Sequence, residues 1–279
     1  MNMLTLEAAT GLRLGVFLAV FAAMAAWEAL SPRRPLTTPK AGRWGRNLGL
    51  AVLNAACVQL LIPLQAVGVA AWADRGGWGL LRLAGLAPAP ALVLAVVLLD
   101  LAIYLQHRWF HRVPALWRLH LVHHVDLDID VTTGARFHPV EILLSMGIKM
   151  AVVGLLGASV AAVVCFEILL NGTSMFNHGN VRLAAPVDRA LRLAVVTPDM
   201  HRVHHSVLPR ETGSNFGFNL PWWDRLFGTY RPQPEAGHAG MTIGLPAFRD
   251  PRRVGLGRLL ALPFEPAGRG PGAPGGTHG

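Results

Sequence analysis

The sequence predicts an all-helical integral membrane protein, with four to five membrane-embedded helices and a helical, histidine-rich cap. Two observations predict this class. The 279 residues are 52% hydrophobic and only 15% charged, whereas soluble domains carry about 25% charged residues, and the apolar residues form runs of bilayer length. In addition, ten of the twelve histidines fall between residues 107 and 205. The class therefore combines membrane spans with one polar, histidine-bearing region.

Four apolar segments provide the membrane helices. Residues 11–30, 47–72 and 84–105 are each predicted to span once, since a bilayer needs about 20 apolar residues. A cleaved signal peptide is the competing interpretation of 11–30, and a basic loop after this long segment favours a retained span. Residues 140–176 are too long for one crossing. Gly154 and Gly157 near their middle indicate two helices, or a hairpin that does not fully cross.

The charge distribution predicts orientation. The loop 31–46 carries five Lys or Arg residues and no acid, so the positive-inside rule places it in the cytoplasm. Counting forward then puts the end of the third span and residues 178–279 on the same side. The net charge of +9 consequently suits an anionic membrane surface and not nucleic acid. Cys57 and Cys165 lie in apolar runs and are predicted to be small buried side chains.

The histidines form three clusters with helical spacing. His107 and His111 make an HxxxH pair, while HxxHH occurs at His120, His123 and His124 and again at His201, His204 and His205. Spacings of three and four place each set on one helix face, where imidazoles can share a metal. Eight imidazoles exceed the four ligands of a tetrahedral zinc, so they suit two ions. Imidazole alone does not select the metal, and neither HExxH nor a pair of ExxH motifs is present.

These clusters and the sequence between them resemble bacterial members of the fatty acid hydroxylase/sterol desaturase superfamily. The resemblance covers about 95–235 and includes HRWFH (107–111), HLVHH (120–124), HRVHH (201–205), NHGNVRL (177–183) and NFGFNLPWWDRLFGTY (215–230). It implies a membrane-bound, O2-dependent di-iron oxidase acting on a lipid C–H bond. It also implies a division into 1–94 (N-terminal spans), 95–235 (hydroxylase-like domain) and 236–279 (a partly disordered tail).

Carried over by position, the resemblance implies metal ligation by the histidines of the three clusters and by His178. Asn180 stands where some members have a further histidine, which leaves the ligand count open, and His138 is a candidate for ligation, for contact with a ligand or for a helix start. No catalytic residue beyond the ligands is expected. The implied ligands are His107, His111, His120, His123, His124, His178, His201, His204 and His205.

Several other side chains are candidates to support the site. Asp100 and Tyr104 share a helix face with His107 and His111, and an Asp near the end of a span is expected to orient a ligand histidine. For Glu167, a core partner and a substrate-channel role both stay open, and Asp199 is expected to cap the last histidine helix. The aromatic residues of 215–230 are expected on the bilayer surface over the metal site, and direct contact with the substrate stays open for one or two of them. Asp126, Asp128, Asp130 and Glu141 are more typical of solvated surface than of ligand contacts.

The favoured function is hydroxylation or desaturation of an unactivated lipid C–H, with a sterol or fatty acyl chain among the substrates. Two iron ions are expected, with zinc as a substitute in purified protein, together with O2. No haem, iron–sulfur or dinucleotide motif is present, so a small carrier protein is expected to deliver electrons. We expect a bacterial inner-membrane protein with a cytoplasmic metal site. The alternatives are a histidine-rich metal transporter and a metal-binding protein without oxidase activity.

Overall fold

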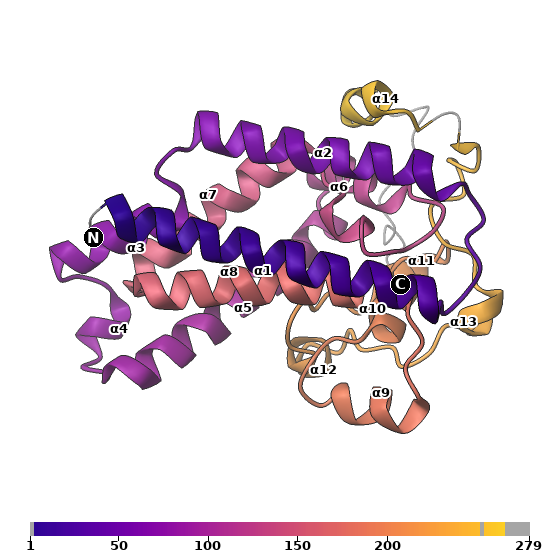
Figure 1. The fold of residues 1–279 in the computed structure, drawn as a ribbon. Coiled ribbons are helices and arrows are strands. Elements are labelled where there is room, and N and C mark those ends of the chain that lie inside the picture. The colour runs from indigo at the N-terminus through magenta and orange to yellow at the C-terminus, as the bar shows by residue number, and fades with distance from the viewer. Residues whose placement is uncertain (1–2, 252–253, 266–279) are drawn as a thin grey trace.

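The computed structural model describes residues 3–251 and 254–265. Every regular element in these ranges is a helix, and extended pairing is limited to two isolated bridges, Pro32 with Val181 and Ser206 with Ile243. Long helices lie along one another, and most of the short helices gather at one end of them (Figure 1). The predicted all-helical class is therefore confirmed.

Five helical segments are long and apolar enough to cross a membrane, and the second of them runs from Lys40 to Leu83. The predicted span at 47–72 lies within this segment, which is broken at Pro63: α2 ends at Leu61, and a further helix, α3 (Gln65–Gly76), starts after the proline. Proline lacks the N–H that a continuing helix needs. A short α4 (Leu80–Leu83) follows. The five long helices are α1 (Met3–Leu30), α2 (Lys40–Leu61), α5 (Pro88–Arg112), α7 (Pro139–Leu156) and α8 (Val160–Asn177).

The apolar segment 140–176 divides into two helices, as one of the two predicted arrangements has it. Gly157 ends α7 in the left-handed conformation with φ +64°, and a Cβ there would lie 2.4 Å from the carbonyl oxygen of Trp78. Only glycine fits such a close backbone approach without strain. Ser159 then caps α8 by accepting a hydrogen bond from the N–H of Ala162. The hairpin is therefore set by local sequence.

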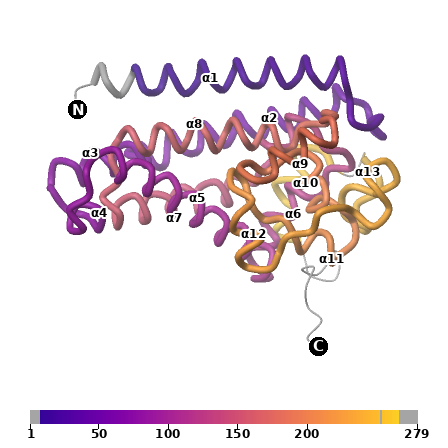
Figure 2. The backbone as a smooth tube through the Cα atoms, turned by 90° about the horizontal axis from the view of Figure 1, so that it is seen from below, coloured from indigo at the N-terminus to yellow at the C-terminus, as the bar shows by residue number. Residues whose placement is uncertain are grey.

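The helices α3, α5, α7 and α8 share the main apolar core, which includes Val67, Leu99, Val153 and Phe166. Helix α1 forms an outer layer (Figure 2) that packs mainly on α8, where Met24 contacts the cluster around Met175. Large apolar side chains elsewhere on these helices are exposed, which suits contact with lipid. They include Leu18 on α1, Val52 on α2 and Val93 on α5.

The cap is assembled from short helices at the end where α1, α5 and α8 finish and α2 and α7 begin (Figure 1). A separate apolar cluster joins Leu50 of α2 and Trp117 to Leu245, Phe248 and Leu259. The C-terminal part of the described chain is thereby fixed to the cap. The cap consists of α6 (Pro114–His124), η1 (Thr133–Ala135), α9 (Ala185–Leu191), α10 (Pro198–His204), α11 (Pro209–Thr212), α12 (Trp222–Leu226), α13 (Gly237–Gly240), α14 (Leu256–Ala261) and η3 (Leu262–Phe264).

Two further expectations are revised. Cys165 is exposed on α8 and Cys57 is half-buried, so neither is the buried side chain that was predicted. Both lie on spanning helices, where an exposed position faces lipid and is still apolar. Of the predicted tail 236–279, residues 236–251 and 254–265 are described and include α13, α14 and η3. The Gly/Pro-rich stretch 264–279, which was expected to be disordered, lies with His278 outside the described residues, apart from Phe264 and Glu265.

Candidate metal centre

Four segments bring the nine predicted ligand histidines together. Helix α5 carries two of them near its end, α6 carries three, α10 and its C-cap carry three, and His178 is the C-cap of α8. Each of the nine side chains is at most 3% exposed. Prolines start α6 and α10 at positions where their missing N–H has no helical partner, so both short helices begin at fixed points of the chain.

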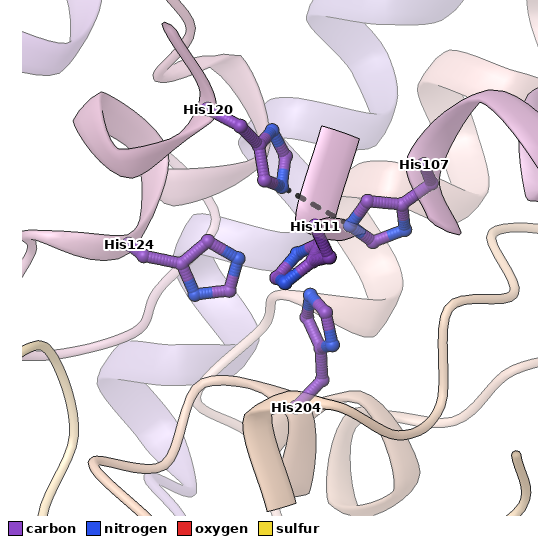
Figure 3. A group of neighbouring side chains, drawn as sticks. All are labelled: His107, His111, His120, His124 and His204. Carbon is purple, nitrogen blue, oxygen red and sulfur yellow. Dashed lines mark hydrogen bonds between the residues drawn. The ribbon is translucent and has the colours of Figure 1, made fainter. Parts of the chain in front are cut away.

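The nine imidazoles form two groups, and within each group the candidate ligand atoms all lie within 4.8 Å of one another. The five-histidine group is drawn in Figure 3, where the rings point toward a common centre. Both HxxHH motifs contribute to both groups. The five-histidine group consists of His107, His111, His120, His124 and His204, and the four-histidine group consists of His123, His178, His201 and His205.

The facing nitrogens have the separation expected of ligands that share one ion. His107 Nε2 and His120 Nε2 are 3.1 Å apart. In the other group, His178 Nε2 lies 3.1 Å from Nε2 of both His123 and His201. Two nitrogens at about 2.1 Å from one metal stand roughly 3.0–3.4 Å apart, depending on the coordination angle. Both groups therefore fit a metal ion.

The outward-facing nitrogens are held by hydrogen-bond acceptors around the site. His107 Nδ1 donates to the carbonyl oxygen of Phe216 at 2.8 Å, and His204 Nδ1 donates to that of Ser214 at 2.8 Å. His120 Nδ1 donates to the Glu141 carboxylate at 2.6 Å. Such partners fix the tautomer and the ring orientation of metal ligands. His123 and His178 are held similarly, by the carbonyl oxygens of Arg136 and Ser174.

Burial keeps the imidazoles neutral and therefore able to bind metal. It lowers the pKa of His120 to about 3 and that of His178 to about 4. Burial, together with the neighbouring histidines, also lowers the pKa of His124 and His205 well below the ordinary value. Several ring nitrogens, among them Nε2 of His124, His204 and His205, have no hydrogen-bond partner in the described part of the chain. Since an unpartnered buried nitrogen is costly, a metal ion is the group that satisfies this arrangement.

Aromatic side chains enclose the site. The Phe137 ring lies parallel to His123, with centroids 4.5 Å apart and an interplanar angle of 5°. Phe216 and Phe218 contact His107 at centroid distances of 5.6 and 5.1 Å, and Trp117 contacts His111 at 5.0 Å. These residues keep water from the imidazoles. Phe216 and Phe218 are buried, so their predicted place on the bilayer surface is wrong, whereas Trp222 and Phe227 of the same stretch are exposed.

Asp100 does not contact a ligand histidine, in contrast to the prediction. It contacts a loop that in turn contacts one. Its carboxylate accepts hydrogen bonds from the backbone N–H of Asn219 and Leu220 and from Trp223 Nε1. These bonds hold the loop whose Phe216 carbonyl orients His107. Tyr104 likewise avoids the histidines and hydrogen-bonds with Thr229.

His138 lies outside both groups, and the structure gives it the helix-start role. It caps α7, because its Nδ1 accepts a hydrogen bond from the N–H of Val140, and its Nε2 donates to the carbonyl oxygen of Leu260. Asp199 does not cap α10, contrary to prediction: Thr197 does, and Asp199 pairs with Arg33 and Arg202 instead.

The acids after α6 are buried, although a solvated surface was the more typical expectation. Asp126 and Asp130 bind Arg43 of α2, with distances of 2.8 and 2.6 Å. Asp128 accepts hydrogen bonds from the backbone and hydroxyls of Thr37 and Thr38. Although burial opposes ionisation, Arg43 and Arg136 hold the pKa of Asp126 below its ordinary value. The network ties α2 to the loop that carries Arg136, whose carbonyl orients His123.

Sequence reasoning overlooked Phe137 and underrated Glu141. The RFHP motif drew attention to His138, yet its neighbour Phe137 is the residue that touches a ligand histidine. Glu141 lies three residues after His138 on the same helix, and an acid at the start of an apolar helix next to a histidine motif was the available signal. Glu167, for which two roles were open, pairs with Arg13 and Lys149 inside the membrane helices.

The profile of the fatty acid hydroxylase family matches residues 92–229, which include all nine histidines. An ornithine lipid hydroxylase of Rhizobium tropici is 28% identical over 274 residues, which cover 91% of this chain and 76% of the relative. Alkylglycerol monooxygenases of Xenopus tropicalis and Danio rerio are 29% and 31% identical over 63% and 56% of this chain, but over only 42% and 34% of their own lengths. No solved structure matches the chain. The chain belongs to the fatty acid hydroxylase family and is an oxidoreductase.

Proposed function

We propose that this protein hydroxylates an unactivated C–H bond of a membrane lipid, using O2, two electrons from a small carrier protein and two protons from solvent, with water as the second product. The observation that supports this most directly is the pair of buried imidazole groups. Two iron ions bound there would supply O2 activation and C–H oxidation. The relatives named for hydroxylation of an ornithine lipid and for alkylglycerol oxygenation support a lipid substrate.

Residues of this chain would bind the two ions and exclude water from them. The five-histidine and four-histidine groups would each hold one ion, and Glu141 and the carbonyl oxygens around the groups keep the imidazoles oriented. Phe137, Phe216 and Phe218 exclude water, which would otherwise quench a strong oxidant. The division of the chain into segments 1–94, 95–235 and 236–279 stays a prediction.

We also propose that the protein resides in a cell membrane, with its metal centre on the cytoplasmic side. Arg33 and Arg34 lie in the connection between α1 and α2, and Lys40 is the first residue of α2, at the end of the molecule that holds the histidines. Basic residues in short loops favour the cytoplasmic side. A metal transporter would need ligands along the spans, whereas all nine histidines gather at one end, and this supports the oxidase over the transporter.

The test combines metal analysis with lipid mass spectrometry. Protein purified with iron should hold two ions per chain, and cells that express it should gain lipids heavier by one oxygen. His204→Ala should abolish the lipid product. His138→Asn is the matched control, since Asn also caps helices and His138 lies outside both groups, and it should retain metal and product. Iron-loaded protein that binds metal but oxidises no lipid, with electrons supplied, would refute the proposal.

A further inference from the structure

A pocket of about 470 Å³ opens between α1, α2, α3 and α7. Its middle is apolar and is lined by Ala55, Val58, Val67 and Ile142. Helix α1 stands as an outer layer over this side of the molecule (Figure 2), and its contacts are made mainly with α8. The pocket volume lies in the range of small-molecule sites, which are typically about 300–1,000 Å³.

One lining residue connects the pocket to the segment that packs on the metal centre. Asn54, which lines the pocket, donates from Nδ2 to the carbonyl oxygen of Phe137 at 3.0 Å. The Phe137 ring in turn lies flat on His123. Asn54 is 6% exposed, and its Oδ1 has no hydrogen-bond partner in the described chain. Asn54 thus links the pocket, through the backbone of Phe137, to the residue whose ring packs on a candidate ligand.

The pocket lining includes one cationic side chain, Arg13. Arg13 pairs with Glu167 of α8, and the same carboxylate accepts from Lys149 of α7 at 2.8 Å. Two cations therefore share one carboxylate within membrane-spanning helices. Charges at such depth are costly and mark functional positions, and an excess of positive charge favours an anionic ligand. Gln59 and Gln65, joined by a hydrogen bond of 3.0 Å, complete the polar lining.

We infer that this pocket binds one hydrocarbon chain of the substrate lipid, with an oxyanion of that lipid at Arg13 and the chain running toward Phe137. The inference rests on the proposed lipid hydroxylation and assigns its substrate site. Lys149 stands eight residues after Glu141 on α7, which is about 12 Å along the helix. The oxidised carbon therefore lies within the chain, at a distance of that order from the oxyanion.

Photocrosslinking with three lipids of equal chain length tests this site. The probes are a fatty acid, a lysophosphatidic acid and a fatty alcohol, each with a diazirine in the chain, added to the purified full-length protein. We expect the anionic probes to label residues 54–59 of α2, and the better-labelling anion identifies the carboxylate or the phosphate. Ala55→Phe, which fills the pocket, should lower this labelling at least tenfold. The control Val52→Phe adds the same ring to the exposed face of α2 and should leave labelling unchanged.

A second variant tests the charge. Arg13→Gln should lower labelling by the anionic probes about tenfold, as expected for a lost charged hydrogen bond, and leave the alcohol probe unchanged. Equal labelling of residues 54–59 in Ala55→Phe and Val52→Phe would overturn the pocket assignment, and equal anionic labelling in Arg13→Gln would overturn the oxyanion assignment. Lipid oxidation that persists in Ala55→Phe rejects the pocket and leaves the proposed function standing. Labelling of residues 54–59 without lipid oxidation by the iron-loaded protein supports the pocket and rejects the proposed function.

Discussion

Acid should destabilise the metal-free protein, because its buried histidines are neutral. Burial lowers the pKa of His120 to about 3 and of His178 to about 4, whereas both titrate near 6.5 when exposed. Below pH 6.5 the unfolded chain therefore binds more protons than the folded chain, and stability falls as the pH falls. The loss begins near pH 6.5 and continues until the folded-state pKa values are reached.

The magnitude follows from the width of that window. At pH 5 each of these two histidines lies 1.5 pH units below its unfolded pKa, which corresponds to a loss of about 2 kcal/mol each. The remaining cap histidines, such as His124 and His205, shift in the same direction and add to the loss. Since domains are typically stable by about 5–15 kcal/mol, two histidines alone remove a large fraction.

The assay is thermal unfolding of detergent-solubilised, metal-free protein between pH 7.5 and 5, read through protection of the cap segments 114–138 and 178–251 from proteolysis. We expect a large decrease in the unfolding temperature over this range, and a higher temperature with bound metal at pH 7.5. An unfolding temperature that stays constant down to pH 5 would refute the reasoning, since the imidazoles would then be protonated or solvated in the folded protein.

Three further outcomes are expected. Removal of one ligand from either group, by His123→Ala or His204→Ala, should lower the iron content measured by elemental analysis without preventing membrane insertion, and unchanged iron content in both would contradict the ligand assignment. Glu141→Leu removes the acceptor of His120 and should weaken metal affinity by about 10–100-fold in a chelator competition, with Val140→Leu as the neutral control. Arg43→Met removes the guanidinium that pairs with the buried carboxylates of Asp126 and Asp130 and should cost about 3–5 kcal/mol in unfolding experiments, so an unchanged unfolding temperature would count against the network.

The histidines could be predicted from sequence because their chemistry and helical spacing are local properties. The spacing did not reveal that each HxxHH motif is divided between two groups: His120 and His124 face one group, while His123 faces the other. That division depends on how α6 packs against α5, α8 and α10. It requires the tertiary structure.

The acids after α6 show why other predictions failed. Locally, three acids within five residues are typical of surface, but their partner Arg43 lies more than 80 residues earlier in the chain. The role of Asp100 could not be predicted for the same reason, because the carboxylate accepts hydrogen bonds from a loop that lies 119 residues later in the chain. The helix break at Pro63 was obscured for another reason, since apolar residues continue on both sides of it.

The division of the histidines between the groups also sets an order of assembly during synthesis. Four of the five imidazoles in the five-histidine group come from residues 107–124, so this half of the centre nears completion as soon as α6 has been made. Three of the four in the other group come from His178, His201 and His205, and they wait for α8 and α10. A nascent chain that ends before α10 contains the sequence of all five long helices and lacks His201 and His205 of the four-histidine group. That group can therefore be completed only after the last long helix has been synthesised.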